Sequence, residues 1–312
     1  MSHPTNDAGI PTRPFGRHPE HVSLIGLGGY HSTDPTKLTE AASHKLIRRA
    51  VDEGITFLDN AWCYHDGLAE ERMGRTLDEG KIRDKVFLMS KCCGRTAQDA
   101  QSCLEDSLRR LKTDHLDLWQ LHEMCYDNDP EWISRPGGAL EYAAKAKEQG
   151  KIRHLGFTGH KDPSIHLEML TKDYEWDSSQ LPLNVMDAHY RSFQHKVVPR
   201  LAERGIAVIG MKSLGGAGQI VSEAGVTVEE ALTYVFSLPI ATLVSGIDSE
   251  KILDQNLKII RGFQPLSAVE MAAIERKVVD VAGDGRFELF KSAKTFDGPF
   301  HRKQHGFEVE AA

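Results

Sequence analysis

Short apolar runs alternate with longer amphipathic segments along most of the chain. The apolar runs are typical of strands buried on both faces, and the segments between them repeat apolar positions at helical spacing. Strands are predicted at 22–29, 55–59, 85–91, 116–122, 152–159, 178–185, 206–213 and 241–247. Helices are predicted after them, at 37–54, 67–80, 97–112, 137–151, 163–170, 196–205, 227–238 and 249–262.

This alternation predicts an α/β fold, the (β/α)8 TIM barrel, because right-handed crossovers between parallel strands close into a ring. The alternative is a doubly wound dinucleotide-binding sheet, which "GLGG" (26–29) invites. That stretch lacks a third glycine and does not open directly into a helix, so the barrel is favoured. A leader with "RPFGRHPEH" precedes the barrel, and a tail after Gln264 adds one more predicted helix at 266–283. No linker is visible, so residues 1–312 are expected to form a single domain.

Composition narrows the function classes. Charged residues make up 27% of the 312 residues and hydrophobic ones 40%, which is typical of a soluble globular protein. The net charge of -7 argues against a broad nucleic-acid-binding surface, and no apolar run is long enough to span a membrane. The first 20 residues lack the apolar core of a signal peptide, so a cytoplasmic location is expected.

The spacing of the cysteines does not indicate stabilising cross-links or a structural metal site. The five cysteines include no CxxC pair, so neither a disulfide network nor a structural zinc site is expected. They are Cys63, Cys92, Cys93, Cys103 and Cys125.

Polar residues stand where neighbouring predicted strands end: Asp59, Lys91 and His122, with Tyr64 in the loop beyond Asp59. Taken singly, each is a solvated or capping residue, but the carboxyl ends of barrel strands meet at one mouth. There a lysine favours a tyrosine phenolate and lowers its pKa, an aspartate holds the lysine, and a neutral histidine orients a carbonyl oxygen. Such a site protonates a developing alkoxide. It therefore needs a hydride donor, which a nicotinamide cofactor supplies and no side chain does.

Three stretches around these residues resemble the aldo-keto reductases, a family of (β/α) barrels that bind a nicotinamide cofactor without a Rossmann fold. They are "GITFLDNAWCYHDGLAEERMGRTL", "VFLMSK" and "LDLWQLH". The resemblance implies an NADP-dependent oxidoreductase that reversibly reduces aldehydes and ketones to alcohols. It implies Asp59, Tyr64, Lys91 and His122 as the catalytic set, with Tyr64 as general acid. A small-molecule carbonyl substrate and no metal are expected, with NADPH as the cofactor and NADH as the alternative.

Four further stretches resemble the cofactor-binding parts of the same family. "RPFGRHPEHVSLIGLGG" resembles its opening hairpin and first strand, and "GKIRHLGFTGH" its fifth strand. "MKSLGGAG" resembles the loop around the pyrophosphate, and "VSGIDSEKILDQN" the last phosphate- and adenine-binding segment. Closely spaced glycines also let backbone N–H groups approach a phosphate, and a helix start offers free N–H groups. The expected cofactor-binding residues are Gly28, Gly29, Tyr30, Thr158, Gln180, Ser213, Leu214, Gly215, Gly246, Asp248, Ser249, Lys251, Gln255 and Asn256.

The chain departs from the family pattern at two places. Thr158 and Gly159 replace the usual Ser-Asn pair, which leaves no side chain at the second position. Ile252 stands where an arginine is expected shortly before the closing pair, here Gln255 and Asn256. Because arginine binds a phosphate with a bidentate fork, only a modest preference for NADPH over NADH is expected.

Aromatic residues in the loops at the mouth are the candidates to face the substrate: Tyr30, Trp62, Tyr126 and Trp132. Each can equally anchor a loop. The tail stretch "FELFKSAKTFDGPFHRK" (287–303) is expected to fold over the mouth and set specificity.

Two other functional classes stay open at this stage. A metal-dependent barrel hydrolase could use Asp59 and His122 as ligands, although it needs further ligands and a nearby lysine is awkward. A redox-sensing regulatory member of the same fold, similar to the potassium-channel β subunits, would keep the same four residues. The sequence indicates neither the physiological substrate nor the oligomeric state.

Overall fold

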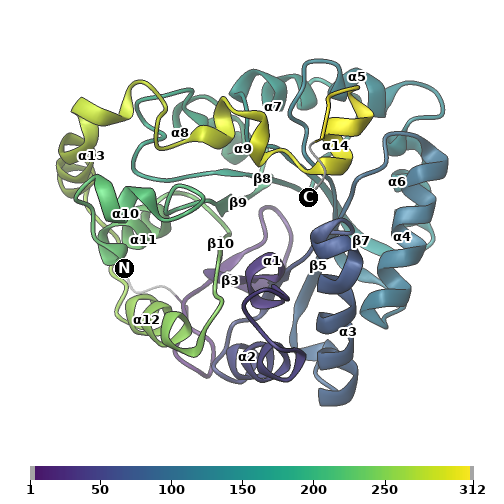
Figure 1. The fold of residues 1–312 in the computed structure, drawn as a ribbon, viewed down its shortest axis with the longest axis horizontal. Coiled ribbons are helices and arrows are strands. Elements are labelled where there is room, and N and C mark those ends of the chain that lie inside the picture. The colour runs from purple at the N-terminus through teal and green to yellow at the C-terminus, as the bar shows by residue number, and fades with distance from the viewer. Residues whose placement is uncertain (1–3, 310–312) are drawn as a thin grey trace.

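The computed structural model describes residues 4–309, which contain a closed barrel of parallel strands surrounded by helices (Figure 1). The strands follow one another round the ring in chain order, so the predicted fold class is confirmed. The final strand pairs with the first one, Leu243 opposite Ile25. The barrel strands are β3 (Ile25–Gly28), β4 (Phe57–Asp59), β5 (Phe87–Cys92), β6 (Leu116–Leu121), β7 (Ile152–Thr158), β8 (Ser178–Pro182), β9 (Ala207–Met211) and β10 (Thr242–Ser245).

The outer helices lie largely where the apolar spacing predicts them. The helices of the layer are α2 (Glu40–Asp52), α3 (Leu68–Gly80), α4 (Ala97–Leu111), α6 (Ala139–Glu148), α7 (Pro163–Met169), α8 (Phe193–Lys196), α9 (Val198–Glu203), α11 (Val228–Ser237) and α12 (Glu250–Arg261). The helix predicted at 196–205 corresponds to the shorter α9, which has Pro199 in its first turn, where the missing N–H is tolerated; a separate short helix, α8, precedes it and ends at Lys196. Across residues 4–309, every helix is too short or too polar to cross a bilayer.

Smaller elements fill the loops between strands and helices. Helix α5 was missed because its segment was expected to be a loop, although a proline near its start is a helix signal. The short helices are α1 (Gly29–Ser32), α5 (Asp129–Ser134) and α10 (Gln219–Glu223), with 3-10 turns η1 (Tyr64–Gly67) and η2 (Arg83–Lys85).

The predicted opening hairpin closes the amino-terminal end of the barrel. Strands β1 (Thr12–Pro14) and β2 (His21–Ser23) pair antiparallel, and the turn between them carries Phe15. The Phe15 ring is fully buried, with its centroid 4.8 Å from that of Phe87. Phe57 and Phe87 stand at the starts of β4 and β5, so this apolar plug fills the lower end and leaves the carboxyl end for chemistry.

The carboxyl end is covered by the chain's last segment, which confirms that the tail folds over the mouth. After α13 (Ala268–Ala282) come η3 (Leu289–Lys291), η4 (Lys294–Phe296) and α14 (Pro299–Gln304). Figure 1 shows this yellow segment crossing the carboxyl side toward α5. His305, directly after α14, bonds Asp129 of α5 at 3.1 Å.

Three buried groups fix the tail at its start. Lys291 Nζ lies 2.6 Å from Asp187 Oδ1 and 2.9 Å from Glu288 Oε1, and donates to the Tyr190 carbonyl oxygen at 2.7 Å. All three charged side chains are fully buried. Buried charges are stable only when paired in this way, so the cluster locks the start of the tail to the loop after β8.

Candidate active site

A buried ion pair joins the ends of β4 and β5. Asp59 is 2% exposed and Lys91 is 1% exposed. Lys91 Nζ donates to Asp59 Oδ1 at 2.7 Å and to the Asn60 carbonyl oxygen at 2.8 Å. Two acceptors for one ammonium compensate its removal from water and fix its position.

Tyr64 completes this contact from the turn that follows. Its hydroxyl lies 3.3 Å from Lys91 Nζ. The turn carries positive φ angles at two non-glycine residues, 50° at His65 and 55° at Asp66, a conformation that costs about 1–3 kcal/mol per residue. Arg110 of α4 secures the turn from behind by donating to the Trp62 carbonyl oxygen at 3.0 Å. The strained turn is therefore held by its surroundings, and it aims the phenol at Lys91.

The pKa of Tyr64 is shifted upward, whereas the sequence predicted a downward shift. Burial raises the pKa of the phenol well above its usual value, and the Asp59 carboxylate raises it further. The sequence predicted a lowered pKa from Lys91 alone and took no account of burial. The phenol is therefore protonated at neutral pH, which is the form that can donate a proton.

Gln180, in the middle of β8, joins the same group. Its Nε2 donates to Asp59 Oδ2 at 2.8 Å, so both carboxylate oxygens of Asp59 are occupied. Its own Oε1 is buried and, among residues 4–309, has no hydrogen-bond partner. A buried acceptor without a partner is costly in an apolar interior, so this oxygen is a candidate contact for a ligand.

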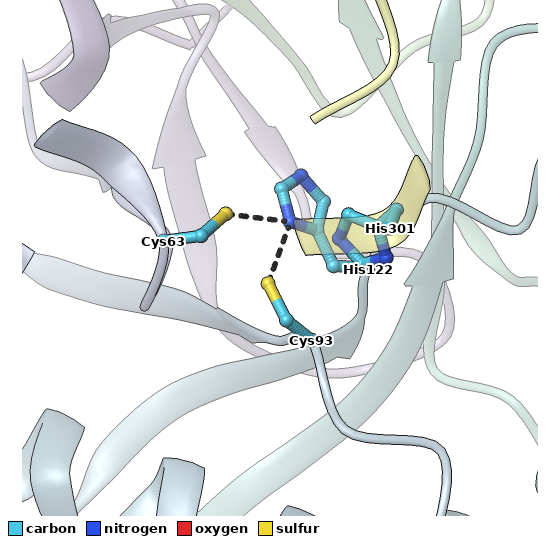
Figure 2. A group of neighbouring side chains, drawn as sticks. All are labelled: Cys63, Cys93, His122 and His301. Carbon is cyan, nitrogen blue, oxygen red and sulfur yellow. Dashed lines mark hydrogen bonds between the residues drawn. The ribbon is translucent and has the colours of Figure 1, made fainter. Parts of the chain in front are cut away.

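His122 follows β6 and faces two thiols. Its Nδ1 lies 3.4 Å from Cys93 Sγ and 3.5 Å from Cys63 Sγ (Figure 2). Burial lowers the pKa of His122 well below its usual value, and the proximity of His301 and Lys91 lowers it further. The imidazole is therefore neutral, as the sequence predicted. When a thiol donates to Nδ1, the ring hydrogen stands on Nε2 and is free to donate.

The glycines assigned to the cofactor lie at constricted points of the mouth. A Cβ on Gly29 would stand 2.6 Å from the Asp59 carbonyl oxygen, so only glycine fits beside the ion pair. Gly215 has a φ of 83°, and Gly216 has a φ of 84° in the loop after β9. Ser213, just before them, is buried, and Leu214 is half-buried. Backbone N–H groups in such a loop can come close to a phosphate.

The departure at position 159 has a steric reason. A Cβ on Gly159 would stand 2.2 Å from the Met124 carbonyl oxygen. The asparagine of the family pattern therefore does not fit this backbone. Thr158 remains buried at the end of β7, and Tyr30 is 48% exposed with its ring 5.3 Å from that of Tyr64.

The predicted cofactor-binding residues around the start of α12 make different contacts. Ser249 caps the helix by accepting from the Ile252 N–H. Asp248 is paired with Lys37 at 2.7 Å. Asn256 is buried and donates to Ser245 Oγ at 2.8 Å, which holds the end of β10. Lys251 and Gln255 are exposed beside this helix start, and Gly246 lies against the His31 ring.

The sequence profile of the Aldo/keto reductase family matches residues 24–223, which span β3 to α10. The chain belongs to this family. Methylglyoxal reductase YeaE of Escherichia coli is 31% identical over 214 residues, 64% of this chain and 67% of that protein. The 6-dehydroglucose reductase of Novosphingobium aromaticivorans is 33% identical over 49% of this chain and 53% of its own length. The match thus spans about half to two thirds of these curated relatives.

Solved aldo-keto reductases share the fold over a longer stretch. One from Klebsiella pneumoniae, in complex with NADPH, has a TM-score of 0.71 and 26% identity, over 86% of this chain and 95% of that chain. One from Bacillus halodurans in its holo form has a TM-score of 0.72 at 24% identity, over 86% of this chain and 96% of that one. At that identity the Bacillus structure supports the fold alone.

The aromatic residues expected to face the substrate lie mostly under the aldo-keto reductase's tail. Trp62 is half-buried, its Nε1 donates to Asp106 at 3.2 Å, and its ring packs on Phe300 of α14. Tyr126 bonds Asp297 of the tail, and Trp132 packs edge-on against His305. The structure thus favours the anchoring role for these three.

Several residues near the site were missed by sequence reasoning. Lys212 follows β9 with a φ of 58°, 5.4 Å above the Phe290 ring. His301 of α14 stacks edge-on against His122, with ring centroids 5.2 Å apart. For Lys212, its position at the end of an apolar strand was the available signal. For His301 the signal was the predicted folding of residues 287–303 over the mouth, which did not indicate His122 as its neighbour.

Proposed function

We propose that this chain reduces the carbonyl group of small aldehydes or ketones to alcohols, with Tyr64 as general acid and NADPH as hydride donor. One observation carries the proposal: Lys91 Nζ contacts both Asp59 Oδ1 and the Tyr64 hydroxyl in a buried site at the mouth of the barrel. Family membership supports it, as does the related enzyme from Klebsiella pneumoniae that binds NADPH. We also propose that the barrel and the tail act together as a single domain.

Each member of the set has a separate task in this proposal. His122 Nε2–H orients the carbonyl oxygen toward Tyr64, which donates its phenolic proton to the developing alkoxide. The Lys91 ammonium then stabilises the phenolate that forms, and Asp59 keeps Lys91 charged and in place. A positioned acid of this kind contributes about 10²–10⁴-fold to a rate.

The residues at the mouth fit a nicotinamide cofactor, which supplies the hydride when bound. The unpartnered Gln180 Oε1 offers an acceptor for a carboxamide N–H next to the ion pair. The positive φ angles at Gly215 and Gly216 leave backbone N–H groups that can approach a pyrophosphate. The amino-terminal end of α12, capped by Ser249, is favourable for a phosphate.

We propose a preference for NADPH that is modest, about one or two factors of ten, each worth about 1.4 kcal/mol. Asp248 can accept from a ribose hydroxyl, which favours NADH, but Lys37 already neutralises it. Lys251 is an exposed point charge and lacks the bidentate fork of an arginine. The ratio of kcat/KM for the two cofactors at fixed ionic strength measures the preference. Lys251→Ala should shrink the ratio while leaving the NADH value nearly unchanged, and a parent that is equally efficient with NADH contradicts the assignment.

The purified chain should oxidise NADPH in the presence of a panel of aliphatic and aromatic aldehydes and ketones. Multiple turnovers with excess carbonyl distinguish an enzyme from a redox-sensing member of the same fold, which would bind the cofactor without sustained turnover. A hydrolase is disfavoured because both carboxylate oxygens of Asp59 already accept from Lys91 and Gln180. Cofactor binding without turnover on any carbonyl of the panel would contradict the proposal.

A further inference from the structure

Two thiols and two imidazoles converge beside the candidate active site. Cys63 stands between β4 and η1, Cys93 directly after β5, His122 directly after β6 and His301 on α14. One donor atom from each lies within 4.8 Å of all the others. Figure 2 shows both sulfur atoms pointing at the same nitrogen of His122, with the His301 ring alongside. Four separate segments therefore contribute to one donor cluster.

The spacing of these donors matches a tetrahedral ion. Zinc binds a thiolate at about 2.3 Å and an imidazole nitrogen at about 2.0–2.1 Å, so in a tetrahedron each sulfur lies about 3.6 Å from each nitrogen. The corresponding separations here, from His122 Nδ1 to Cys93 Sγ and to Cys63 Sγ, are 3.4 and 3.5 Å. Little movement of these three groups is needed to enclose a cation.

The fourth donor is only weakly held by its present neighbours. His301 is 1% exposed, and its Nε2 has no hydrogen-bond partner among residues 4–309 but lies 3.9 Å from Glu123 Oε2. Its Nδ1 receives only a long contact of 3.4 Å from Arg95. Arg95 is itself paired with Asp129 at 2.9 Å, so it does not depend on His301. Coordination through either ring nitrogen would cost His301 one long contact, to Arg95 at Nδ1 or to Glu123 at Nε2.

The charges also suit a divalent cation. As the metal–sulfur bonds form, both thiols release their protons to water, and two thiolates then balance a divalent ion. Nearby Lys91 is paired with Asp59, so its charge is already compensated. Two sulfur and two nitrogen donors select zinc and similar ions over magnesium or calcium.

We propose that Cys63, Cys93, His122 and His301 form a zinc-binding site that regulates this protein. Binding at His122 Nδ1 leaves the Nε2 hydrogen in place, but it fixes the ring to three other ligands and ties α14 to the mouth, so His122 can no longer rotate toward a carbonyl substrate. The inhibitory consequence rests on the proposed reductase function, whereas metal binding itself does not. The cysteine spacing gave no sign of such a site, because the donors come from distant segments.

Binding is tested on the full chain, reduced and stripped of metal, by titrating Zn²⁺ against a chromophoric chelator. The parent should bind a single equivalent. Cys93→Ser and His301→Gln should each weaken binding by at least about 100-fold, because loss of even an outer partner costs about 10–100-fold. Cys103→Ser is the matched control, since that thiol is buried outside the cluster and should bind zinc as the parent does.

Cobalt gives a second readout that does not depend on activity. Co²⁺ in the parent should show the intense visible bands of a tetrahedral ion and a thiolate charge-transfer band in the near ultraviolet. Both should be lost in Cys63→Ser, which replaces the one half-buried ligand and so tests the site even if Cys93→Ser fails to fold. Weak octahedral bands in the parent would overturn the proposal.

The location is tested against the neighbouring group of Cys125, His160 and Asp297, which also brings possible donors together. Zinc binding that survives in Cys63→Ser and Cys93→Ser but is lost in Cys125→Ser overturns the assignment. If the parent turns over a carbonyl, zinc should inhibit it, a chelator should restore it, and Cys103→Ser should respond identically. A chain with no reductase activity that binds zinc as described contradicts the proposed function and leaves the site standing.

Discussion

Lys91 and Lys291 are both buried lysines near the mouth, and each is held by a carboxylate and a backbone carbonyl oxygen. Lys91 contacts Asp59 and the Asn60 carbonyl, and Lys291 contacts Asp187 and the Tyr190 carbonyl. Each also has a tyrosine close by. At Lys91 the phenol of Tyr64 reaches the ammonium at 3.3 Å, whereas Tyr190 presents its ring face, 6.0 Å from Lys291 Nζ.

The difference shows what turns a structural ion pair into a candidate catalytic one. Both lysines meet the same electrostatic requirement of burial, which is a partner for every charge. Only the first shares its ammonium with a hydroxyl that can gain or lose a proton. Lys291 has instead a second carboxylate, Glu288, at 2.9 Å, which fixes the tail. We therefore expect changes at the first site to affect turnover, and changes at the second to affect stability.

The largest effect is expected from removal of the Tyr64 hydroxyl. Tyr64→Phe should lower kcat by about 10²–10⁴-fold, the range for a positioned acid, while NADPH affinity measured by fluorescence quenching changes little. Tyr190→Phe is the matched control and should keep turnover near that of the parent. Near-parent turnover in Tyr64→Phe would remove the distinction between the two lysines.

The next effect concerns coupling within the first site. Lys91→Met and Asp59→Asn should each disable the same proton transfer, so the double variant should be hardly slower than the worse single one. Steady-state kcat for the four proteins of the cycle gives the coupling. Losses that multiply independently would mean that Asp59 and Lys91 do not act as a unit.

Lys291→Met should reduce the free energy of unfolding by about 3–5 kcal/mol, because it leaves Asp187 and Glu288 buried without their cation. Lys91→Met should cost less, since Gln180 still donates to Asp59. Urea unfolding of both variants measures the difference, and limited proteolysis should cleave the tail of Lys291→Met first. Equal losses of stability in the two variants would contradict the proposed division of roles.

The smallest effect is a pH dependence of stability. Burial, reinforced by Asp187, raises the pKa of Glu288 to about 7, from an ordinary value near 4.5. Between these values the folded protein binds more protons than the unfolded chain, so the free energy of unfolding falls as pH rises from about 4.5 to 7. We expect Glu288 to contribute about 1–3 kcal/mol to this fall.

Glu288→Gln should flatten the slope in urea unfolding measured across that pH range. Burial also raises the pKa of Glu123 to about 7, so Glu123→Gln should remove a further part of the pH dependence of the free energy of unfolding. An unchanged slope in Glu288→Gln would show that the carboxylate remains ionised beside Lys291.

Local pattern was enough to predict the barrel and the four residues at its mouth. Asp59, Lys91 and His122 each end an apolar run, and parallel strands bring such ends together whatever the rest of the sequence does. Helix caps such as Ser249 are equally local. Features that are determined by a short stretch of sequence and by the parallel direction of the strands could therefore be predicted from the sequence.

Contacts between residues far apart in the chain could not be predicted from local sequence patterns. Lys291 and Asp187 are 104 positions apart, and His301 meets His122 only because the tail folds back across the mouth. The raised pKa of Tyr64 likewise follows from burial by the whole fold. No short stretch around these residues contains that information, because it lies in the packing of the tail on the barrel.

The closing pair β3–β10 and the position of α14 also set an order of events during synthesis. The first barrel strand stays without one of its neighbours until residues 242–245 have been made, so the ring cannot close on a shorter nascent chain. The mouth gains His301 later still, once α14 has been made. Contacts at such long sequence separation form slowly, and an open sheet edge exposes unpaired backbone groups. A nascent chain that still lacks β10 therefore leaves β3 with an open edge that can pair with other chains.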